Sequence, residues 1–358
     1  MVIVSLVLWV WITRSRKAKH KQSRDESDDA TNHFSLKLGG GGFGSVYEGV
    51  LSDGTKIAVK RLDRAGQGAK EFKAEVETLG NIHHLNLVRL KRLCAEKSHR
   101  MLVYEFLPNG SLDKWIFAND TDKKFLDLKT RSKIALHIAR GLSYLHEQCQ
   151  QRIIHLDIKP QNILLDENFN AKVSDFGLAK LIEGEQSEVI TMIRGTPGYM
   201  APELLNKHVS VKADVFSFGI MLVEIVCGKR RREISDDPLF SVLQNMGEGG
   251  RLSDLIDPVL EDEEMDAKGE AVKMLRLGML CIQDDSTSRP TMSIVVKALE
   301  GMIELHSVPS TSSPSSDHPF PSTTKPDRLK LSYTSLSSVL SGRWSFVFIS
   351  KSISQRKH

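Results

Sequence analysis

The polar residues in one short apolar stretch constrain this chain more than any other feature. Asp157, Lys159 and Asn162 interrupt the apolar sequence between residues 154 and 165, and an Asp-Phe-Gly triplet begins thirteen residues after Asn162, at Asp175. By itself, Asp-Phe-Gly is typical of a plain turn. At this spacing, a β-hairpin between the two motifs would deliver Asn162 and Asp175 at its two ends as oxygen ligands for magnesium.

Composition is that of a folded chain with a large core. The chain has 358 residues, of which 40% are hydrophobic and 26% charged, enough for one bilobal unit or two ordinary domains. The net charge of +4 is slight and comes largely from one N-terminal segment, so nucleic-acid binding is not expected. The four cysteines lie far apart, which argues against zinc sites and a disulfide framework and favours a reducing, cytosolic setting.

The N-terminus has the pattern of a membrane anchor. Residues 2–12 are almost wholly apolar, and residues 14–24 carry a run of Lys and Arg typical of a cytoplasmic flank. The apolar segment is shorter than the roughly 20 residues that a membrane span needs. Two interpretations stay open: a gene model truncated within a transmembrane helix, or a short anchor. Both predict a membrane-associated chain whose remainder is cytoplasmic, and without an anchor the chain is expected to be cytoplasmic.

The composition changes along the chain. We expect a short apolar segment (residues 1–12), a charged linker (13–33), a folded domain (34–305) and a tail rich in Ser, Thr and Pro (306–358). The tail cannot bury enough apolar surface to order itself, so we expect it to be disordered.

Periodicity predicts strands first and helices later. Residues 45–50 and 56–61 read as two strands joined by an Asp-Gly turn, which is a strong hairpin signal. Residues 70–80 read as a helix with one apolar face that ends at Gly80. Helical periods return over 130–145 and 211–226. This order predicts an α+β protein with a strand-rich N-terminal part and a mainly helical C-terminal part.

A glycine-rich segment precedes the first predicted hairpin. Gly39, Gly41 and Gly44 have the G-x-G-x-x-G spacing that lets backbone amides approach phosphate oxygens. The same spacing marks dinucleotide-binding folds, but there the turn opens a helix, whereas residues 45–50 read as a strand. Taken alone, the segment is equally typical of a flexible turn.

A single cation lies on the next predicted strand. Successive side chains of a strand point to opposite faces, so Ala58 and Lys60 share one face and the ammonium group lies beside an apolar surface. Glu75 lies near the inward face of the following helix, where a carboxylate is costly unless it is paired. Each residue alone is equally typical of a solvated surface, but together they predict an ion pair between Lys60 and Glu75.

The motifs from Gly39 onward occur in one order over residues 34–305 and, together with Glu203 in Ala-Pro-Glu, Asp214 and Arg289, resemble a eukaryotic protein kinase domain. The resemblance implies that Asp214 caps a helix and that Arg289 pairs with Glu203. Taken separately, Asp214 and Arg289 are equally typical of surface residues. More narrowly, the chain resembles plant receptor-like kinases related to Pelle, and within them the G-type lectin S-receptor kinases. The resemblance implies a bilobal fold, with a small β-rich lobe that carries one key helix and a larger, mainly helical lobe. The lectin ectodomain of that subfamily is absent from the sequence, which suggests a truncated or cytoplasmic form.

The resemblance also implies a mechanism and its residues. ATP, with Mg²⁺, would lie between the lobes, and protein Ser/Thr hydroxyls would be its acceptors. The implied catalytic residues are Asp157, which orients the hydroxyl and accepts its proton, Lys159, Asn162, Lys60 and Glu75. The implied nucleotide contacts are Gly39, Gly41, Gly44, Val46, Ala58, Lys60, Glu105, Leu107, Leu164 and Asp175, with Asn162 and Asp175 as metal ligands.

Three further residues refine the resemblance. Leu156 stands where these kinases commonly have the Arg of His-Arg-Asp, so the chain resembles the non-RD type, which lacks that cation for a phosphorylated activation loop. Lys159 is typical of Ser/Thr kinases, in which Thr196 would lie against Asp157 and Lys159. Tyr104 falls at the gatekeeper position behind adenine, and it is equally typical of a buried aromatic whose hydroxyl is satisfied.

A binding scaffold without catalysis is the alternative from another class. Such a pseudokinase would be expected to have lost at least one of Lys60, Asp157, Asn162 and Asp175, and all four are present. The sequence therefore favours an active enzyme.

Overall fold

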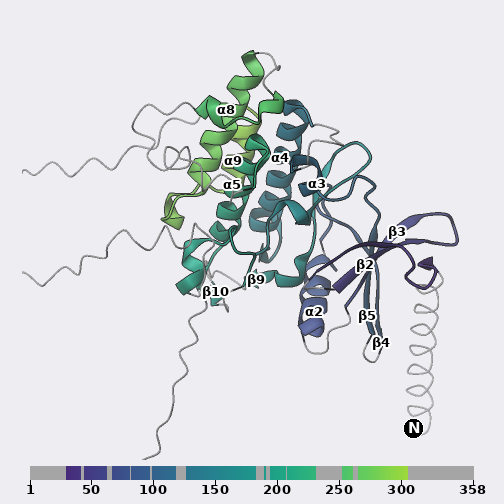
Figure 1. The fold of residues 1–358 in the computed structure, drawn as a ribbon. Coiled ribbons are helices and arrows are strands. Elements are labelled where there is room, and N and C mark those ends of the chain that lie inside the picture. The colour runs from purple at the N-terminus through teal and green to yellow at the C-terminus, as the bar shows by residue number, and fades with distance from the viewer. Residues whose placement is uncertain are drawn as a thin grey trace, which may run out of the picture.

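The computed structural model describes residues 30–41, 44–62, 67–80, 82–96, 99–117, 126–182, 189–190, 194–206, 208–230, 252–260 and 265–304 (Figure 1). The apolar segment 2–12, most of the predicted linker and the predicted tail lie outside these residues. Among the helices that the structure describes, none has the length and apolar character needed to cross a bilayer.

A five-stranded antiparallel sheet and one helix form the smaller lobe. The sheet order is β1-β2-β3-β5-β4, so β1 and β4 are its edges. The strands are β1 (Lys37–Gly41), β2 (Gly44–Val50), β3 (Lys56–Arg61), β4 (Leu90–Glu96) and β5 (His99–Glu105), and the helix is α2 (Gln67–Leu79).

The predicted hairpin between β2 and β3 is confirmed. Gly54 has a φ of 83°, which favours glycine, and the Thr55 amide donates to Asp53 Oδ1 at 2.8 Å. The register pairs Val46 with Lys60 and Tyr47 with Val59 across the two strands. Consequently β3 presents Lys60 on one face of the sheet and Val59 on the other.

Helix α2 begins three residues before the predicted start and ends one residue before the predicted Gly80. The Gly80 amide still donates to the Val76 carbonyl oxygen at 2.9 Å, which closes the last turn. Glu75 is completely buried on the inward face. The prediction of an inward carboxylate on this helix is therefore confirmed.

The larger lobe is built around α5, whose residues from Ala213 to Cys227 are all buried. A helix that is apolar all round must be enclosed by other elements, and α8 and α4 pack against it, while α9 packs against α4. The helices are α3 (Asp113–Ile116), α4 (Leu128–Ser143), α5 (Lys212–Cys227), α8 (Met265–Cys281) and α9 (Met292–Leu299), and a π-helical turn, η1 (Tyr144–Gln148), continues α4.

Short strands and 3₁₀ turns carry the polar motifs between the lobes. The strands are β6 (Arg152–Ile154), β7 (Ile163–Leu165), β8 (Ala171–Val173), β9 (Lys180–Ile182), β10 (Val189–Ile190) and β11 (His208–Val209). The 3₁₀ turns are η2 (Pro160–Asn162), η3 (Phe176–Leu178), η4 (Pro202–Asn206), η5 (Leu252–Leu255), η6 (Pro258–Leu260) and η7 (Ser286–Ser288). They pair as β6-β9, β7-β8 and β10-β11.

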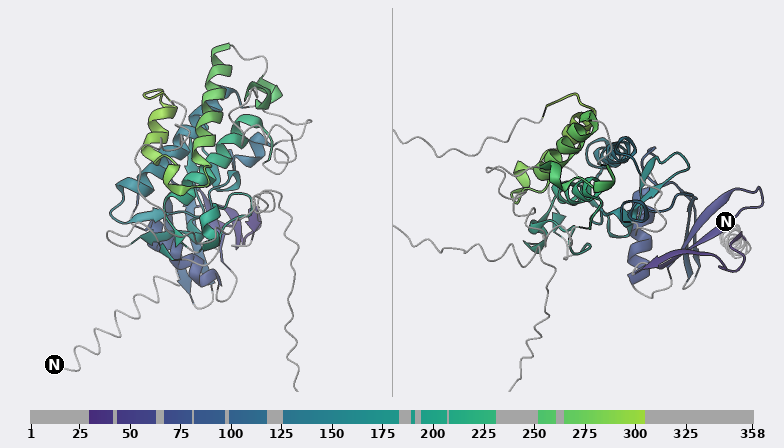
Figure 2. Two further views of the ribbon diagram at one scale, coloured as in Figure 1. Left: turned by 90° about the vertical axis from the view of Figure 1, so that its left-hand side faces the viewer. Right: turned by 45° about the horizontal axis from the view of Figure 1, so that its top comes forward.

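The two lobes lie at opposite ends of the molecule in Figures 1 and 2, with the purple and blue sheet at one end and the green helices at the other. A segment just before β4 joins them, because the Val88 amide donates to the Val173 carbonyl oxygen and the Val173 amide to that of Asn86, both at 2.9 Å. The predicted α+β, bilobal architecture is confirmed.

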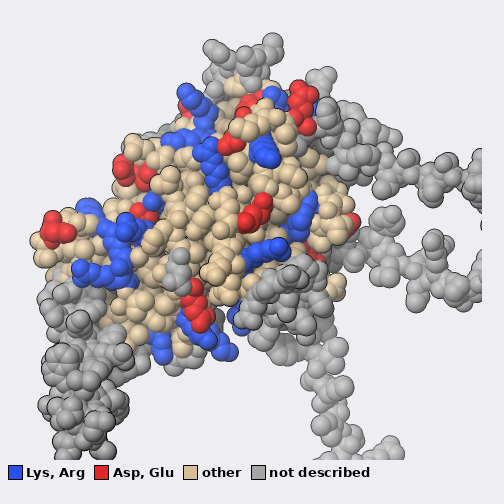
Figure 3. Space-filling view, turned by 180° about the vertical axis from the view of Figure 1, so that it is seen from behind, with Lys and Arg blue, Asp and Glu red and all other residues tan. Residues whose placement is uncertain are grey.

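Charge on the face shown in Figure 3 is mixed, with Lys and Arg interspersed among Asp and Glu. No extended field of one sign covers that face in the part of the chain that the structure describes. A continuous basic surface, which is typical of nucleic-acid-binding proteins, is therefore not seen there.

Candidate active site

Lys60 lies at the centre of a buried charged cluster between the lobes. Its ammonium group donates to Glu75 Oε1 and, at 2.8 Å, to Asp175 Oδ1. Burial by itself would lower the pKa of Lys60, but the carboxylates of Glu75 and Asp175 outweigh burial and raise that pKa above its usual value. Lys60 is therefore charged at physiological pH. The predicted ion pair is confirmed, and Asp175 extends it.

Tyr104 contributes a second donor to Glu75. Its hydroxyl donates to Glu75 Oε2, and both residues are buried. Burial, followed by the neighbouring Glu75 carboxylate, raises the pKa of Tyr104 well above its ordinary value, so the hydroxyl keeps its proton. The two oxygens of Glu75 are thus held from β3 and from β5. The gatekeeper hydroxyl is satisfied by the residue that orients Lys60, which no local pattern predicted.

Asp157 accepts hydrogen bonds on both of its carboxylate oxygens. Thr196 Oγ1 donates to Oδ1 at 2.6 Å, while Lys159 Nζ and Asn162 Nδ2 donate to Oδ2 at 2.7 and 2.9 Å. Lys159 also donates to Thr196 Oγ1 at 2.8 Å. These contacts fix the orientation of the carboxylate, and they confirm the expected placement of Thr196 against Asp157 and Lys159.

The two predicted metal ligands lie at the two ends of one hairpin, as the sequence predicts. Strand β7 follows Asn162 and β8 precedes Ser174, whose amide and hydroxyl both donate to the Asn162 carbonyl oxygen at 2.9 Å. Because Asn162 Nδ2 donates to Asp157, the side-chain oxygen Oδ1 is turned the other way. An amide oxygen and a carboxylate with two phosphate oxygens make a donor set that suits Mg²⁺.

Asp214 does not cap its own helix, contrary to the role that the resemblance implies. It lies in the first turn of α5, which has no side-chain cap, and it is completely buried. Oδ2 accepts from the His155 amide at 2.7 Å and from His146 Nε2 at 2.9 Å, and Oδ1 accepts from the Leu156 amide at 2.9 Å. The carboxylate points across to the catalytic loop because two successive amides there have no other acceptor in a regular element.

Those two amides explain an unusual backbone at Leu156. Its φ of 66° lies in the left-handed region, where an L-residue costs roughly 1–2 kcal/mol. Charge-assisted hydrogen bonds to Asp214 offset this cost. Asp214 therefore holds the loop that carries Asp157 in its strained conformation.

The Leu156 side chain is 5% exposed and packs in an apolar cluster below the catalytic loop. The buried members are Ile154, Leu156, Ile182, Ala201, Leu204, Val209, Ala213, Phe216 and Ile220. Apart from Leu156 itself, they come from β6, β9, the Ala-Pro-Glu turn, β11 and α5. The segment after Asp175 is thus held near the catalytic loop by apolar contact with Leu156.

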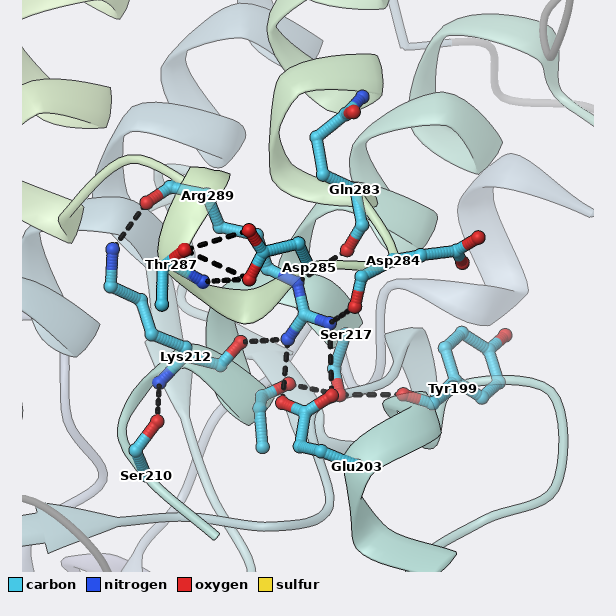
Figure 4. Close-up of polar contacts among 11 residues, drawn as sticks. Tyr199, Glu203, Ser210, Lys212, Ser217, Gln283, Asp284, Asp285, Thr287 and Arg289 are labelled. Carbon is cyan, nitrogen blue, oxygen red and sulfur yellow. Dashed lines mark hydrogen bonds and ion pairs between the residues drawn. The ribbon is translucent and has the colours of Figure 1, made fainter. Parts of the chain in front are cut away.

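Arg289 and Glu203 form the predicted ion pair in Figure 4. Arg289 Nη1 and Nη2 donate to the two carboxylate oxygens of Glu203 at 2.6 and 2.9 Å, which is a bidentate arrangement. Further guanidinium bonds go to the carbonyl oxygens of Gln283, Lys212 and Asp284. Since Arg289 is 1% exposed, these partners are what make its burial tolerable.

The glycine-rich segment is a strand-turn-strand, as predicted for a phosphate loop of this kind. Gly41 pairs with Gly44 across β1 and β2, and no helix follows, which rules out the dinucleotide-binding alternative. Gly44 has a φ of 127°, and a Cβ there would lie 2.3 Å from the Arg61 carbonyl oxygen. Gly39 has open space around it. The close approach of the Arg61 backbone therefore requires glycine at position 44, whereas no neighbouring atom requires glycine at position 39.

The remaining predicted nucleotide residues lie on strands of the smaller lobe, on β7 and in the connection between the lobes. Val46 is the cross-strand partner of Lys60, Ala58 is that of Tyr104, and Leu164 belongs to β7. Glu105 ends β5, and Leu107 follows it in the connection between the lobes.

The Glu105 carboxylate is occupied by other groups. It accepts from Lys172 Nζ at 2.8 and 2.9 Å and from the Arg89 amide at 2.8 Å. The carboxylate therefore connects the end of β5 to β8 and to the segment before β4. No sequence pattern predicted the contact with Lys172, which lies half-buried on β8 between the buried Ala171 and Val173.

Comparison with known proteins agrees with this geometry. Residues 33–299 match the family model described as protein kinase domain, so the chain belongs to the protein kinase family. Protein kinase domains use ATP and a divalent metal ion.

Named relatives are plant receptor-like kinases. The chain is 51% identical over 291 residues to the Arabidopsis thaliana G-type lectin S-receptor-like serine/threonine-protein kinase SD2-5, covering 79% of this chain and 35% of that protein. A second Arabidopsis protein of that class is 50% identical over 76% of this chain and 32% of its own length. A probable LRR receptor-like serine/threonine-protein kinase of the same plant is 45% identical over 77% of this chain and 27% of its own length. The chain thus spans about a third of the relatives it matches.

Proposed function

We propose that this protein is a serine/threonine kinase that transfers the γ-phosphoryl group of ATP to Ser and Thr hydroxyls of proteins. The observation that carries the proposal is the Asp157 carboxylate, which Lys159, Asn162 and Thr196 hold in one orientation. In the reaction, the acceptor oxygen bonds to the γ-phosphorus, the bond to the β–γ bridging oxygen breaks, ADP leaves, and the hydroxyl proton passes to Asp157.

In this proposal the other polar residues between the lobes bind and orient ATP. Lys60, held by Glu75, would contact the α- and β-phosphates, and Lys159 would contact the transferred phosphoryl group. Asn162 and Asp175 would hold Mg²⁺, which when bound neutralises charge on the phosphates. Asp175 is already bonded to Lys60, and burial, which raises its pKa, is outweighed by that ammonium group, which lowers it. The carboxylate is therefore ionised and ready to act as a ligand.

Phosphate transfer measured on the full chain tests this function. With radiolabelled ATP and peptides that differ in Ser, Thr or Tyr acceptors, we expect label on Ser and Thr. Asp157→Asn should abolish transfer, whereas Asp53→Asn, which changes an exposed carboxylate at the β2–β3 turn, should not. Glu75→Gln and the exposed Glu77→Gln make a second matched pair on α2. Undiminished transfer by both Asp157→Asn and Asp175→Asn would reject the enzymatic assignment, and label on Tyr alone would reject the specificity.

We further infer that activity depends little on phosphate in the activation loop, which makes this a non-RD kinase. The support is Leu156, which lies in an apolar cluster and has no group that could bond a phosphate. The relatives' names include serine/threonine-protein kinase and receptor-like, which supports the specificity above and a role in receptor-like signalling.

Membrane attachment through residues 2–12 is a separate proposal, supported by that apolar segment and by the basic residues that follow it. Fractionation of a tagged full-length chain tests it. Recovery in the membrane fraction is expected, with the kinase domain accessible from the cytoplasmic side. A wholly soluble product would reject the anchor without affecting the kinase assignment.

A further inference from the structure

A strained turn attaches the start of the described chain to the outer face of the smaller lobe. Three successive residues that are not glycine, Asn32, His33 and Phe34, have φ values of 45°, 56° and 59°. Each is in the left-handed region, which is unfavourable for L-residues and is normally visited by single residues. Such a turn persists only where surrounding contacts hold it. We call residues 30–34 the N-terminal clasp.

Hydrogen bonds close the clasp on itself. Thr31 is 2% exposed, its Oγ1 accepts from the Phe34 amide at 3.2 Å, and its carbonyl oxygen accepts from the Ser35 amide at 3.3 Å. The hydroxyl therefore satisfies an amide that the left-handed turn leaves without a helical partner. This burial holds the turn at one end.

Aromatic and cationic contacts hold the other end against the sheet. The Phe34 ring meets Tyr47 edge to face at 5.1 Å between centroids, and the Arg61 guanidinium carbon lies 4.6 Å from the Phe34 centroid. Tyr47 belongs to β2 and Arg61 to β3. Phe34 thus bridges two neighbouring strands.

A glycine in β2 makes room for the clasp. A Cβ at Gly49 would lie 3.1 Å from the Ala30 carbonyl oxygen and 3.1 Å from Ile57 Cγ1. Gly49 has no positive φ, so its backbone conformation does not require glycine. Glycine is required at position 49 because the clasp passes close over the sheet there.

The clasp covers the strand that carries Lys60. Ala30 and Phe34 pack on a small cluster on the outer face of the sheet, formed by Ile57, Val59, Cys94, Met101 and Val103. Val59 precedes Lys60 and pairs with Tyr47, and Arg61 follows Lys60. Both contacts of the Phe34 ring are therefore made next to Lys60, on the opposite face of the sheet from its ammonium group.

We propose that Phe34 is a positioning residue for phosphoryl transfer. The N-terminal clasp packs against Val59 and Arg61, which precede and follow Lys60 in β3, and so holds the Lys60 ammonium group in reach of Glu75 and Asp175. The inference rests on the proposed role of Lys60 in ATP binding. In this proposal, a pulling force on the polypeptide just before residue 30 would be transmitted through the clasp to β3, the strand that carries Lys60. The strain at residues 32–34 makes release of the clasp easier than release of a relaxed turn.

Steady-state kinetics of full-length Phe34→Ala test the proposal. We expect kcat/KM for ATP to fall by about fivefold or more because Lys60 loses its fixed position, with the KM for the peptide unchanged. Leu51→Ala is the matched control, since Leu51 packs on the same cluster from the turn after β2, away from Lys60. Its melting temperature should fall similarly, while kcat/KM for ATP stays at the wild-type value. Phe34→Leu, which keeps an apolar side chain, should give an intermediate kinetic loss and serves if Phe34→Ala fails to fold.

The outcomes distinguish a positioning role of the clasp from a purely structural role of the apolar cluster, and both from a failure of the proposed role of Lys60. Equal kinetic losses in Phe34→Ala and Leu51→Ala, or a lower melting temperature of Phe34→Ala and Phe34→Leu with wild-type kinetics, would overturn the positioning role. His33→Gly should raise the melting temperature, because glycine accepts the left-handed conformation, and a fall would overturn the strained turn. Wild-type activity of Lys60→Met would reject the proposed role of Lys60 itself, whereas its inactivity alongside a normal Phe34→Ala would reject the clasp alone.

Discussion

Tyr104 donates a hydrogen bond from β5 to the completely buried carboxylate of Glu75 on α2, and the same carboxylate accepts from Lys60 on β3. A buried carboxylate needs several donors to remain ionised, and removal of one leaves an oxygen without a partner. The tyrosine therefore helps to keep α2 seated against the sheet. Its effect on catalysis acts through Glu75.

Tyr104→Phe should lower the free energy of unfolding by about 1–3 kcal/mol, because Glu75 Oε2 loses its donor in a buried place. It should also raise the KM for ATP as Glu75 and Lys60 lose their alignment. Urea unfolding and steady-state kinetics measure the two effects. Tyr199→Phe is a matched control, since the Tyr199 hydroxyl donates to Glu224 in the larger lobe at 2.8 Å. A KM for ATP that rises equally in both variants would contradict this role.

Asp214→Asn should destabilise the catalytic loop. An amide carries no charge and one acceptor oxygen, so bonds to the His155 and Leu156 amides weaken and Leu156 keeps an uncompensated left-handed backbone. We expect about 2–3 kcal/mol of lost stability together with a lower kcat. Urea unfolding and kinetics check this against Asp254→Asn in the exposed part of η5. Wild-type stability of Asp214→Asn would show that the loop does not need the charge.

Arg289→Lys should be far from conservative. A lysine cannot reproduce the bidentate pair with Glu203 or the three carbonyl contacts, so we expect a loss of about 3–5 kcal/mol. Arg140→Lys is the matched control, because Arg140 is 44% exposed in its pair with Glu300 and should cost less than about 1 kcal/mol. Thermal unfolding of both proteins measures the difference. Similar melting temperatures would contradict the prediction.

His137 should make the domain less stable in mild acid. Burial, with help from Lys133 and Arg140, lowers its pKa from 6.5 to about 4 in the folded protein, where Nδ1 accepts from the Ala171 amide. Because the unfolded chain binds the proton more readily, this contribution is complete above pH 6.5 and is lost as the pH falls toward about 4.

The measurement for His137 is the urea midpoint at several pH values between 7 and 4.5. His137→Gln should remove part of the decline, while the remainder includes His84, whose pKa burial also lowers. An unchanged pH dependence in His137→Gln would mean that His137 carries no such contribution.

Leu156→Arg should damage the protein rather than convert it to phosphate-dependent regulation. The new cation would lie in an apolar cluster, so we expect a loss of several kcal/mol or displacement of the catalytic loop. Leu156→Met, with a similar volume, should cost less than about 1.5 kcal/mol. Melting temperatures and phosphate transfer distinguish the two.

The same reading of Leu156 predicts that alanine at both Ser187 and Thr191 leaves phosphoryl transfer largely intact. Mass spectrometry would establish the phosphorylation state of each preparation, and kinetics would follow transfer. Abolished transfer in the double variant would contradict the reading of Leu156.

Much of the active site is readable from the sequence because its spacing is local. A period of two places Ala58 and Lys60 on one face of a strand, and a helical period places Glu75 inward. A hairpin of defined length brings Asn162 and Asp175 to its two ends. These relations hold within short stretches, whatever the rest of the fold does. The order of the motifs carries the resemblance that implied the bilobal architecture.

Only the tertiary structure decided which groups far apart in the chain are in contact. It also decided the backbone conformation at positions where the residue types give no indication of it. Tyr104 lies 29 residues from Glu75, and Asp214 lies 58 from Leu156, so neither pairing has a local period. The left-handed turn that ends at Phe34 contains no glycine to mark it. Burial makes these choices, because a carboxylate or a strained turn removed from water persists only where the surrounding fold supplies its partners.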